Sequence, residues 1–300
     1  MKAEFYIIPD SFAQNALMSN EEVEEKVKAL SKDFKKIKEY PETNKIFIHE
    51  DIFNVVFIDK YTILDLLNYE KKASACLDRD ARIALKHIVW EQETTDNTIE
   101  EVKEILLPEH DEDICCGLIA FNEVKDVNPL FQVVYNIQSW FTFRRHYLGV
   151  HPKNSDFYIE ECKKYFPDIF FHERNKIVIK AILSDCPKKI IYHLAALNDN
   201  FRASQLSGLN RGDVLKHFST NCSLDEEATL EGNASKKPKL TFEFLDKNGK
   251  TQKVCCEPHM KLCHSDTSTS YSNDRRMYFH EGKSDIYEGR FLMGHIGKHL

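Results

Sequence analysis

The 300-residue sequence predicts an α+β fold, in which a mainly helical N-terminal domain is followed by a small, twisted antiparallel sheet. Apolar residues recur with helical period through most of residues 19–217, but they alternate with period two after residue 240. A polar segment, "STNCSLDEEATLEGNASKKPK" at 219–239, separates the two patterns and has the composition of a linker. We therefore expect domains at 1–218 and 240–300, joined by residues 219–239.

The N-terminal part is expected to begin with a short strand and a long helix. "EFYII" at 4–8 is aromatic and β-branched, as strands are. Residues 19–40 predict a helix, because Ser19 can cap it, acids fill its first turn and lysines its end. Its apolar positions form one narrow stripe, consisting of Val23, Val27, Leu30 and Phe34.

The elements that follow are inferred from periodicity alone. One or two strands are expected within 44–62. "DICCGLIAF" at 113–121 is a strand or a buried helix, since a short apolar run does not distinguish the two. The aromatic run from Pro129 to Tyr147 is typical of a buried helix. Further helices are expected at 62–70, 73–92, 97–106, 154–166, 173–184, 187–198 and 203–217.

The C-terminal part predicts about four strands. "KLTFEFLDKNGKTQKV", from residue 239, is typical of a hairpin, because apolar positions alternate before an Asn-Gly turn. "RRMYFHEG" at 275–282 and "RFLMGHIGKHL" at 290–300 predict two further strands.

Charge and cysteine content indicate a cytoplasmic protein with a basic end. Residues 236–300 contain 12 Lys and Arg against 8 Asp and Glu, whereas the rest contains 29 against 40. An anionic partner is therefore expected at the C-terminal part. Nine cysteines, an odd number with two adjacent pairs, are typical of buried thiols in a reducing compartment. No apolar run approaches the roughly 18 residues of a membrane span, and the start lacks the apolar centre of a secretion signal.

"CCEPHMKLCHSD" at 255–266 raises two metal hypotheses. Its thiols and imidazoles suit zinc, but no C-x-x-C pair is present, so we expect no metal site; the candidate ligands are Cys255, Cys256, His259, Cys263 and His264. Glu257 and Lys261, with Asp246 as a second acid, would be a loosened acid–Lys pair of a magnesium-dependent nuclease. That alternative stays open, although three residues rather than one separate Glu257 from Lys261.

Strand periodicity favours RNA cleavage without a metal or other cofactor. His259 and Lys261 share one strand face, as do Arg276, Tyr278 and His280, while the intervening residues are apolar. Metal-free cleavage needs a proton-transferring group and fixed cations beside the phosphate. An amphipathic sheet over a core would also turn Arg, Tyr and His outward, but that reading does not explain why three consecutive strands all carry histidine.

The order "PHMKL … RRMYFH … RFLMGHIGKHL" resembles the end of RelE/YoeB-type ribonuclease toxins. The resemblance covers about 60 of the 300 residues and implies metal-independent endoribonuclease activity on RNA, often mRNA on the ribosome. It implies that Lys261 and Arg276 hold the phosphate, that His259 or His295 transfers a proton, and that Tyr278 positions the base or sugar. Further nucleic-acid contacts are expected from Arg275, His280, Lys298 and His299. The insert at 264–274 is longer than in that family, and the preceding toxin helices are not evident.

The chain also resembles uncharacterised bacterial proteins associated with anti-phage defence, which implies a defence or growth-arrest effector. We expect the N-terminal domain to bind a protein regulator. Arg82 and His87 have the spacing of HEPN-type ribonucleases, but a solvated helix face explains this pair better, because the pattern often occurs by chance. The second class of function is a module that binds nucleic acid or protein without catalysis.

Overall fold

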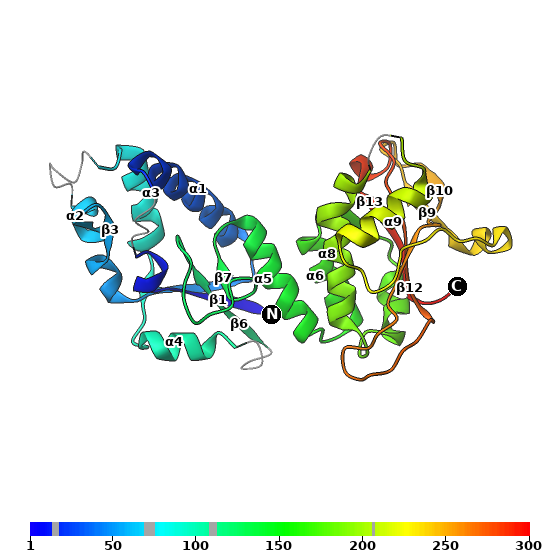
Figure 1. Cartoon of the computed structure of the whole chain (residues 1–300), viewed down its shortest axis with the longest axis horizontal. Helices are drawn as coiled ribbons and strands as arrows, with labels where there is room; N and C mark the ends of the chain where they lie inside the picture. Colours follow the sequence, from blue (N-terminus) through cyan, green and yellow to red (C-terminus); the bar gives the residue numbers. More distant parts are fainter. Residues whose placement is uncertain (14–17, 69–75, 108–112, 206–207) are drawn as a thin grey trace. The chain divides into compact units, whose positions relative to one another are not determined.

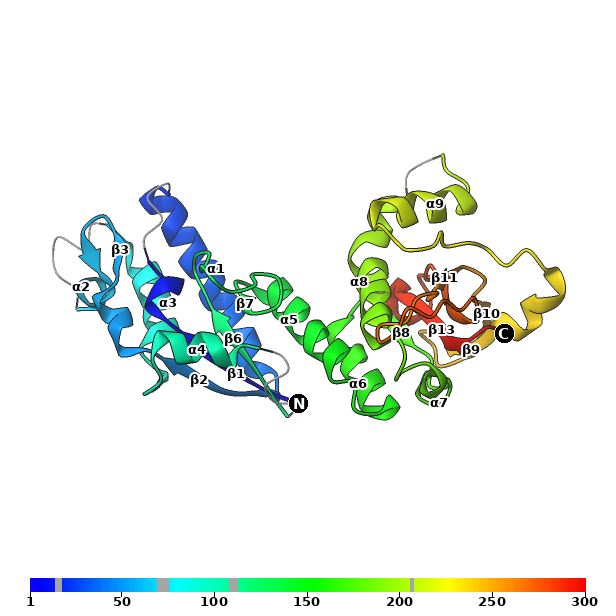
Figure 2. The same ribbon diagram turned by 60° about the horizontal axis from the view of Figure 1, so that its bottom comes forward.

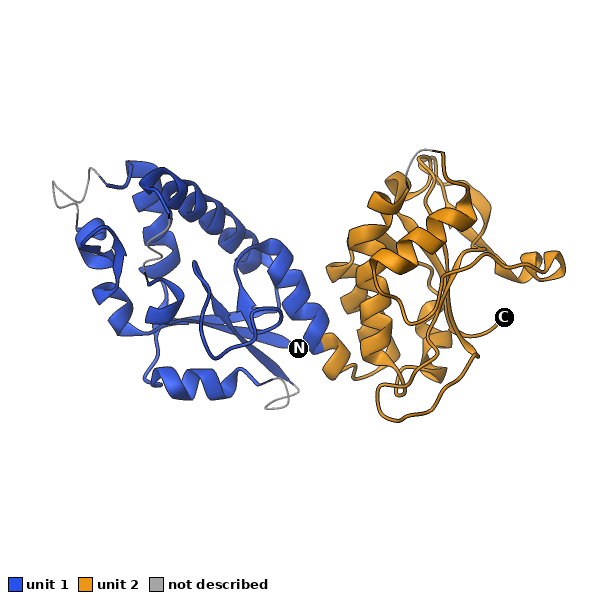
Figure 3. Ribbon diagram, in the orientation of Figure 1, with its two compact units in different colours: residues 1–147 blue, residues 148–300 orange. Residues whose placement is uncertain are grey.

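The computed structural model describes residues 1–13, 18–68, 76–107, 113–205 and 208–300 (Figure 1). It divides into two compact units, Met1–Tyr147 and Leu148–Leu300, coloured separately in Figure 3. Helix α5 (Ile137–Val150) contains the division. Helices and sheets are both present, as the sequence predicts, but their distribution differs from the expected one.

Unit 1 is built on a parallel sheet, which the sequence did not predict, although its helices contain more residues than its strands. The strand order is β5-β2-β1-β6-β7, and each neighbouring pair is parallel. The strands are β1 (Lys2–Ile7), β2 (Thr43–Ile48), β5 (Glu93–Thr94), β6 (Ile114–Ile119) and β7 (Val133–Val134). A separate hairpin pairs β3 (Val56–Ile58) with β4 (Tyr61–Thr62).

Helices cover both faces of this sheet, because parallel strands are apolar on both sides. Tyr6 and Leu118 face a cluster that includes Val102 of α4. Phe5 on the other face contacts the aromatic rings of Trp140 and Phe143 of α5. The helices of the unit before α5 are α1 (Asn20–Glu39), α2 (Ile63–Leu67), α3 (Arg79–Val89) and α4 (Ile99–Ile105).

Several sequence predictions in unit 1 are confirmed. Ser19 caps α1 in a reciprocal bond with Glu22, and the apolar stripe of that helix is buried. "DICCGLIAF" contains strand β6, which settles the open choice. Parts of the helices expected at 62–70 and 73–92 lie outside the described residues.

Unit 2 is built around a four-stranded sheet with the order β11-β12-β13-β8. The strands are β8 (Ile169–Phe171), β11 (His259–Lys261), β12 (Arg275–His280) and β13 (Phe291–Lys298). The pairs β11–β12 and β12–β13 are antiparallel, as expected, but β8 joins β13 in parallel. Because β8 comes from residues 169–171, the sheet is not confined to residues 240–300.

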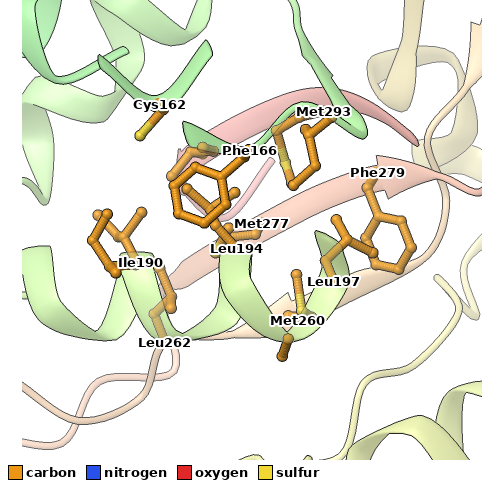
Figure 4. Close-up of a cluster of buried hydrophobic side chains, with 14 of the residues drawn as sticks. Cys162, Phe166, Ile190, Leu194, Leu197, Met260, Leu262, Met277, Phe279 and Met293 are labelled. Carbon is orange, nitrogen blue, oxygen red and sulfur yellow. The ribbon is translucent and has the colours of Figure 1, made fainter. Parts of the chain in front are cut away.

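One face of this sheet packs against helices, and this packing explains why unit 2 begins near residue 148. Figure 4 shows Ile190, Leu194 and Leu197 of α8 against Met260 and Met277 of the strands. Figure 2 shows α8 beside the sheet and α9 next to α8. The helices of the unit are α6 (Ser155–Tyr165), α7 (Asn175–Val178), α8 (Pro187–Ser204) and α9 (Arg211–Asn221). Part of the helix expected at 203–217 lies outside the described residues.

The other face is covered by the predicted hairpin, β9 (Thr241–Leu245) and β10 (Thr251–Cys255). Gly249 lies in its turn with a φ of 76°, which glycine adopts without strain. Gly294 lets the hairpin pack closely on β13, since an added Cβ would lie 2.4 Å from the ring of Phe242. The segment expected as a linker, 219–239, lies inside unit 2 and includes most of a 3-10 helix, η5 (Ala234–Leu240).

Candidate functional site

The structure brings three of the predicted catalytic residues into one row across the C-terminal sheet. The antiparallel register places His259 of β11 opposite Tyr278 of β12, and Tyr278 opposite His295 of β13. The ring centroids of His259 and Tyr278 are 5.0 Å apart, and those of Tyr278 and His295 are 6.0 Å apart. We call these three residues the His–Tyr row.

Two cations accompany the row on the same face. Lys261 and Arg276 are opposite each other in the register of β11 and β12. Arg276 makes a hydrogen bond to the carbonyl oxygen of Arg275 at 2.9 Å, but its Nε is buried without a partner. No carboxylate within the described residues forms an ion pair with Arg276, so no acidic side chain neutralises its charge.

The row is buried, which corrects the expectation of an outward cationic surface. The exposed fractions of His259, Tyr278, His295 and Arg276 are 6%, 0%, 3% and 8%. The hairpin accounts for much of this cover, because Tyr278 belongs to the same apolar cluster as Phe242 and Val254. Period two therefore identified the shared face correctly but not its exposure.

Burial changes the proton affinity of the whole row. It lowers the pKa of His259 and of His295 to about 4, and it raises the pKa of Tyr278 to about 12. Both imidazoles are therefore neutral at pH 7, and the phenol keeps its proton. The Nδ1 of His295 is buried without a hydrogen-bond partner.

A hydrogen-bonded chain leads from the row toward solvent. The Tyr278 hydroxyl lies 2.6 Å from Nδ1 of His299, and Nε2 of His299 lies 2.8 Å from Nζ of Lys236. Burial, followed by repulsion from Lys236, lowers the pKa of His299. Because an ammonium group only donates, Nε2 is the acceptor and a neutral His299 ring donates from Nδ1 to Tyr278. His299 is partly exposed and so can meet a ligand.

The other expected nucleic-acid contacts differ in position. Arg275 points away from the row, and its buried guanidinium bonds the carbonyl oxygens of Leu262 and Cys263 and pairs with Asp185. His280 accepts the N–H of Gly282 at 3.0 Å, and burial lowers its pKa. Lys298 is exposed at the end of β13.

The acids of the magnesium hypothesis are not gathered with Lys261. Glu257 forms ion pairs with Lys237 at 3.0 Å and with Arg211 at 3.6 Å. Asp246 accepts the backbone N–H groups of Asn248 and Lys250 in the hairpin turn. Across the described ranges, no three Cys, His, Asp or Glu side chains are grouped so that they could hold a metal ion.

Sequence reasoning missed Thr229, Lys236 and Arg174, which contact or approach the row from other segments. Oγ1 of Thr229 lies 3.2 Å from Nε2 of His259. The positive charge of Arg174 contributes, after burial, to the low pKa of His295. Their positions depend on tertiary folding, and no period in the sequence indicates them. In the N-terminal pair, His87 is within 3.5 Å of Glu91 on the solvent side of α3.

Comparison of the chain with protein-family models, curated proteins and solved structures finds no match. Within the part of the chain that the structure describes, no helix has both the length and the apolarity needed to cross a membrane.

Proposed function

We propose that unit 2 is a metal-independent endoribonuclease domain whose proton-transferring group is His299. The observation that carries this proposal is the 2.6 Å hydrogen bond between His299 and Tyr278, on a sheet face that also contains Arg276 and Lys261. Tyr278 orients the imidazole, as an ordered partner of a catalytic histidine does. A neutral, partly exposed imidazole can act as a base at pH 7.

In the proposed reaction, Nε2 of His299 takes the proton of a ribose 2′-hydroxyl. The 2′-oxygen attacks the adjacent phosphorus, and the 5′-oxygen leaves with a proton from water. The products are a 2′,3′-cyclic phosphate and a 5′-hydroxyl. Arg276 and Lys261 stabilise the charge that develops on the phosphate oxygens.

The biological setting is part of the same proposal. The protein is a cytoplasmic, toxin-like effector that acts on RNA, including mRNA on the ribosome, in anti-phage defence or growth arrest. Unit 1 binds the protein regulator that such an effector needs.

The test uses the purified full chain and end-labelled RNA in buffer with EDTA. His299→Ala should lower the cleavage rate about 100-fold or more, the usual contribution of a general base. His217→Ala, a partly exposed histidine on α9, is the matched control and should cut normally. Equal cutting by His299→Ala, or cutting only with added magnesium, would contradict the proposal.

A non-catalytic binding module is the second candidate, and the burial of the His–Tyr row favours it. In that case the histidines stabilise the sheet, and Arg276 and Lys261 hold an anionic partner. The same assay separates the two functions, because a module would retain labelled RNA on a filter without shortening it.

A further inference from the structure

A short segment, residues 229–240, crosses the sheet beside the His–Tyr row, and we call it the strap. At one end, Thr229 and His259 exchange backbone hydrogen bonds of 3.0 and 2.9 Å along the outer edge of β11. Near the other end, Lys236 contacts His299, which follows β13. Because β11 and β13 lie on either side of β12, the strap spans the middle strand near Arg276 and Tyr278.

The strap occupies the nitrogen atom that the proposed reaction needs. Lys236 donates to Nε2 of His299, so this lone pair cannot accept a proton from a ribose hydroxyl. Thr229 similarly contacts Nε2 of His259. The strap therefore contacts His259 on the β11 side of Tyr278 and His299 just after β13 on the other side.

Few contacts hold the middle of the strap, residues 232–239, in place. Residues 232–235 and 237–239 are exposed, whereas Leu240 is fully buried and anchors the end of the segment. Glu257 holds the middle of the strap through its ion pair with Lys237. Glu257 also pairs with Arg211 of α9, whose guanidinium forms two hydrogen bonds of 2.9 Å with Glu281. Segments with little buried apolar surface open at low free-energy cost.

We propose that the middle of the strap, residues 232–239, is an inhibitory lid, held closed by Glu257, which lifts between its fixed ends at Thr229 and Leu240 to uncover the His–Tyr row and release Nε2 of His299. That the lid inhibits an enzyme rests on the proposed endoribonuclease function. That the lid covers the histidines does not depend on that function. The proposal gives Glu257 a role as the latch.

A reversible crosslink tests the closed state. Sγ of Cys255 lies 3.9 Å from the carbonyl oxygen of Lys237, so Lys237→Cys is the position chosen for a disulfide to Cys255 that would fix the strap. Oxidation of this variant should slow the carbethoxylation of His259, His295 and His299 by diethylpyrocarbonate at least fivefold, measured by mass spectrometry. RNA cleavage should fall at least tenfold, and dithiothreitol should restore both rates. Wild-type protein taken through the same cycle is the control.

Glu257→Gln tests the open state and does not depend on forming a disulfide. Carbethoxylation of the three histidines and tryptic cleavage after Lys236 and Lys239 should both become several-fold faster. Glu227→Gln, an exposed acid in the preceding loop, should behave as wild type.

The readouts separate the two proposals. Histidine modification that follows the state of the strap, without RNA cleavage in any state, would refute the endoribonuclease and leave the covering role intact. Unchanged modification in both Glu257→Gln and the crosslinked Lys237→Cys would overturn the lid. Equal RNA cleavage by the crosslinked and reduced forms would also overturn it.

Discussion

His259 and His295 are neutral because the fold removes them from water, and this makes unit 2 sensitive to acid. Their pKa in the folded protein is about 4, against an ordinary value of 6.5. The unfolded chain therefore binds these protons more tightly than the folded one. The stabilisation that each neutral imidazole gives is complete above pH 6.5 and is lost as the pH falls from 6.5 to 4.

From the size of the pKa shift, we expect the free energy of unfolding to fall by about 3 kcal/mol for each of the two histidines as the pH falls from 6.5 to 4. Hydrogen exchange of the β12 amides, corrected for intrinsic rates, measures the loss within unit 2. Both tryptophans, Trp90 and Trp140, lie in unit 1, so their fluorescence does not report it. His259→Gln and His295→Gln should each flatten the pH dependence, and His217→Gln should not. Equal protection at pH 7 and pH 4.5 would argue against this assignment.

The same residues show how much of the site was predictable. Period two correctly placed His259 with Lys261, and Arg276 with Tyr278, on shared faces. It could not show which faces meet solvent, because both sides of a strand can be covered by segments distant in sequence. The cover comes from the hairpin and the strap, and the contact between Lys236 and His299 joins residues 63 positions apart.

At the level of elements, the close packing of the hairpin on β13 depends on Gly294. Gly294→Ala would place a methyl group 2.4 Å from the Phe242 ring and 2.9 Å from Sγ of Cys256. We expect a loss of about 1 to 3 kcal/mol in the stability of unit 2, as for other overpacked sites. Gly232→Ala is the matched control, because its added Cβ would meet nothing within 4 Å. Urea unfolding that is the same for both variants would contradict this account of the packing.

Elements with strong local signals were predicted well. Helix α1 was predicted from its cap and charges, and the hairpin from its Asn-Gly turn, because both signals are local. The parallel sheet of unit 1 was missed, since buried parallel strands have no alternation and β5 and β7 have two residues each. The polar composition of 219–239 indicated a boundary, but the chain divides within α5, where no such signal exists.

At the scale of the whole molecule, the two units differ in charge. Residues 1–147 contain 18 Lys and Arg against 28 Asp and Glu, whereas residues 148–300 contain 23 against 20. An anionic partner should therefore be held by unit 2 and repelled by unit 1. Repulsion of this kind weakens binding most at low ionic strength, where charges are least screened.

Binding of single-stranded RNA should weaken as salt is added. A plot of the logarithm of the association constant against the logarithm of the salt concentration should have a slope of about −0.7 for each phosphate contact. Lys298→Ala removes one exposed cation at the end of β13 and should reduce the slope by about that amount. Fluorescence anisotropy with labelled RNA at several potassium chloride concentrations gives the slopes. Lys180→Ala, an exposed lysine in the 3-10 helix Ile179–Ala181, is the control. An unchanged slope in Lys298→Ala would place the RNA elsewhere.

The pairing of β13 with both β12 and β8 also bears on how unit 2 is made. Residues 169–171 leave the ribosome more than a hundred residues before their partners at 291–293. Until β13 arrives, β8 and β12 each have an unpaired edge, which is a template for aggregation. The His–Tyr row cannot assemble before that moment, because His295 belongs to the same strand. The nascent chain is therefore without its candidate site during most of its synthesis, and a chaperone that shields β8 should raise the yield of folded protein.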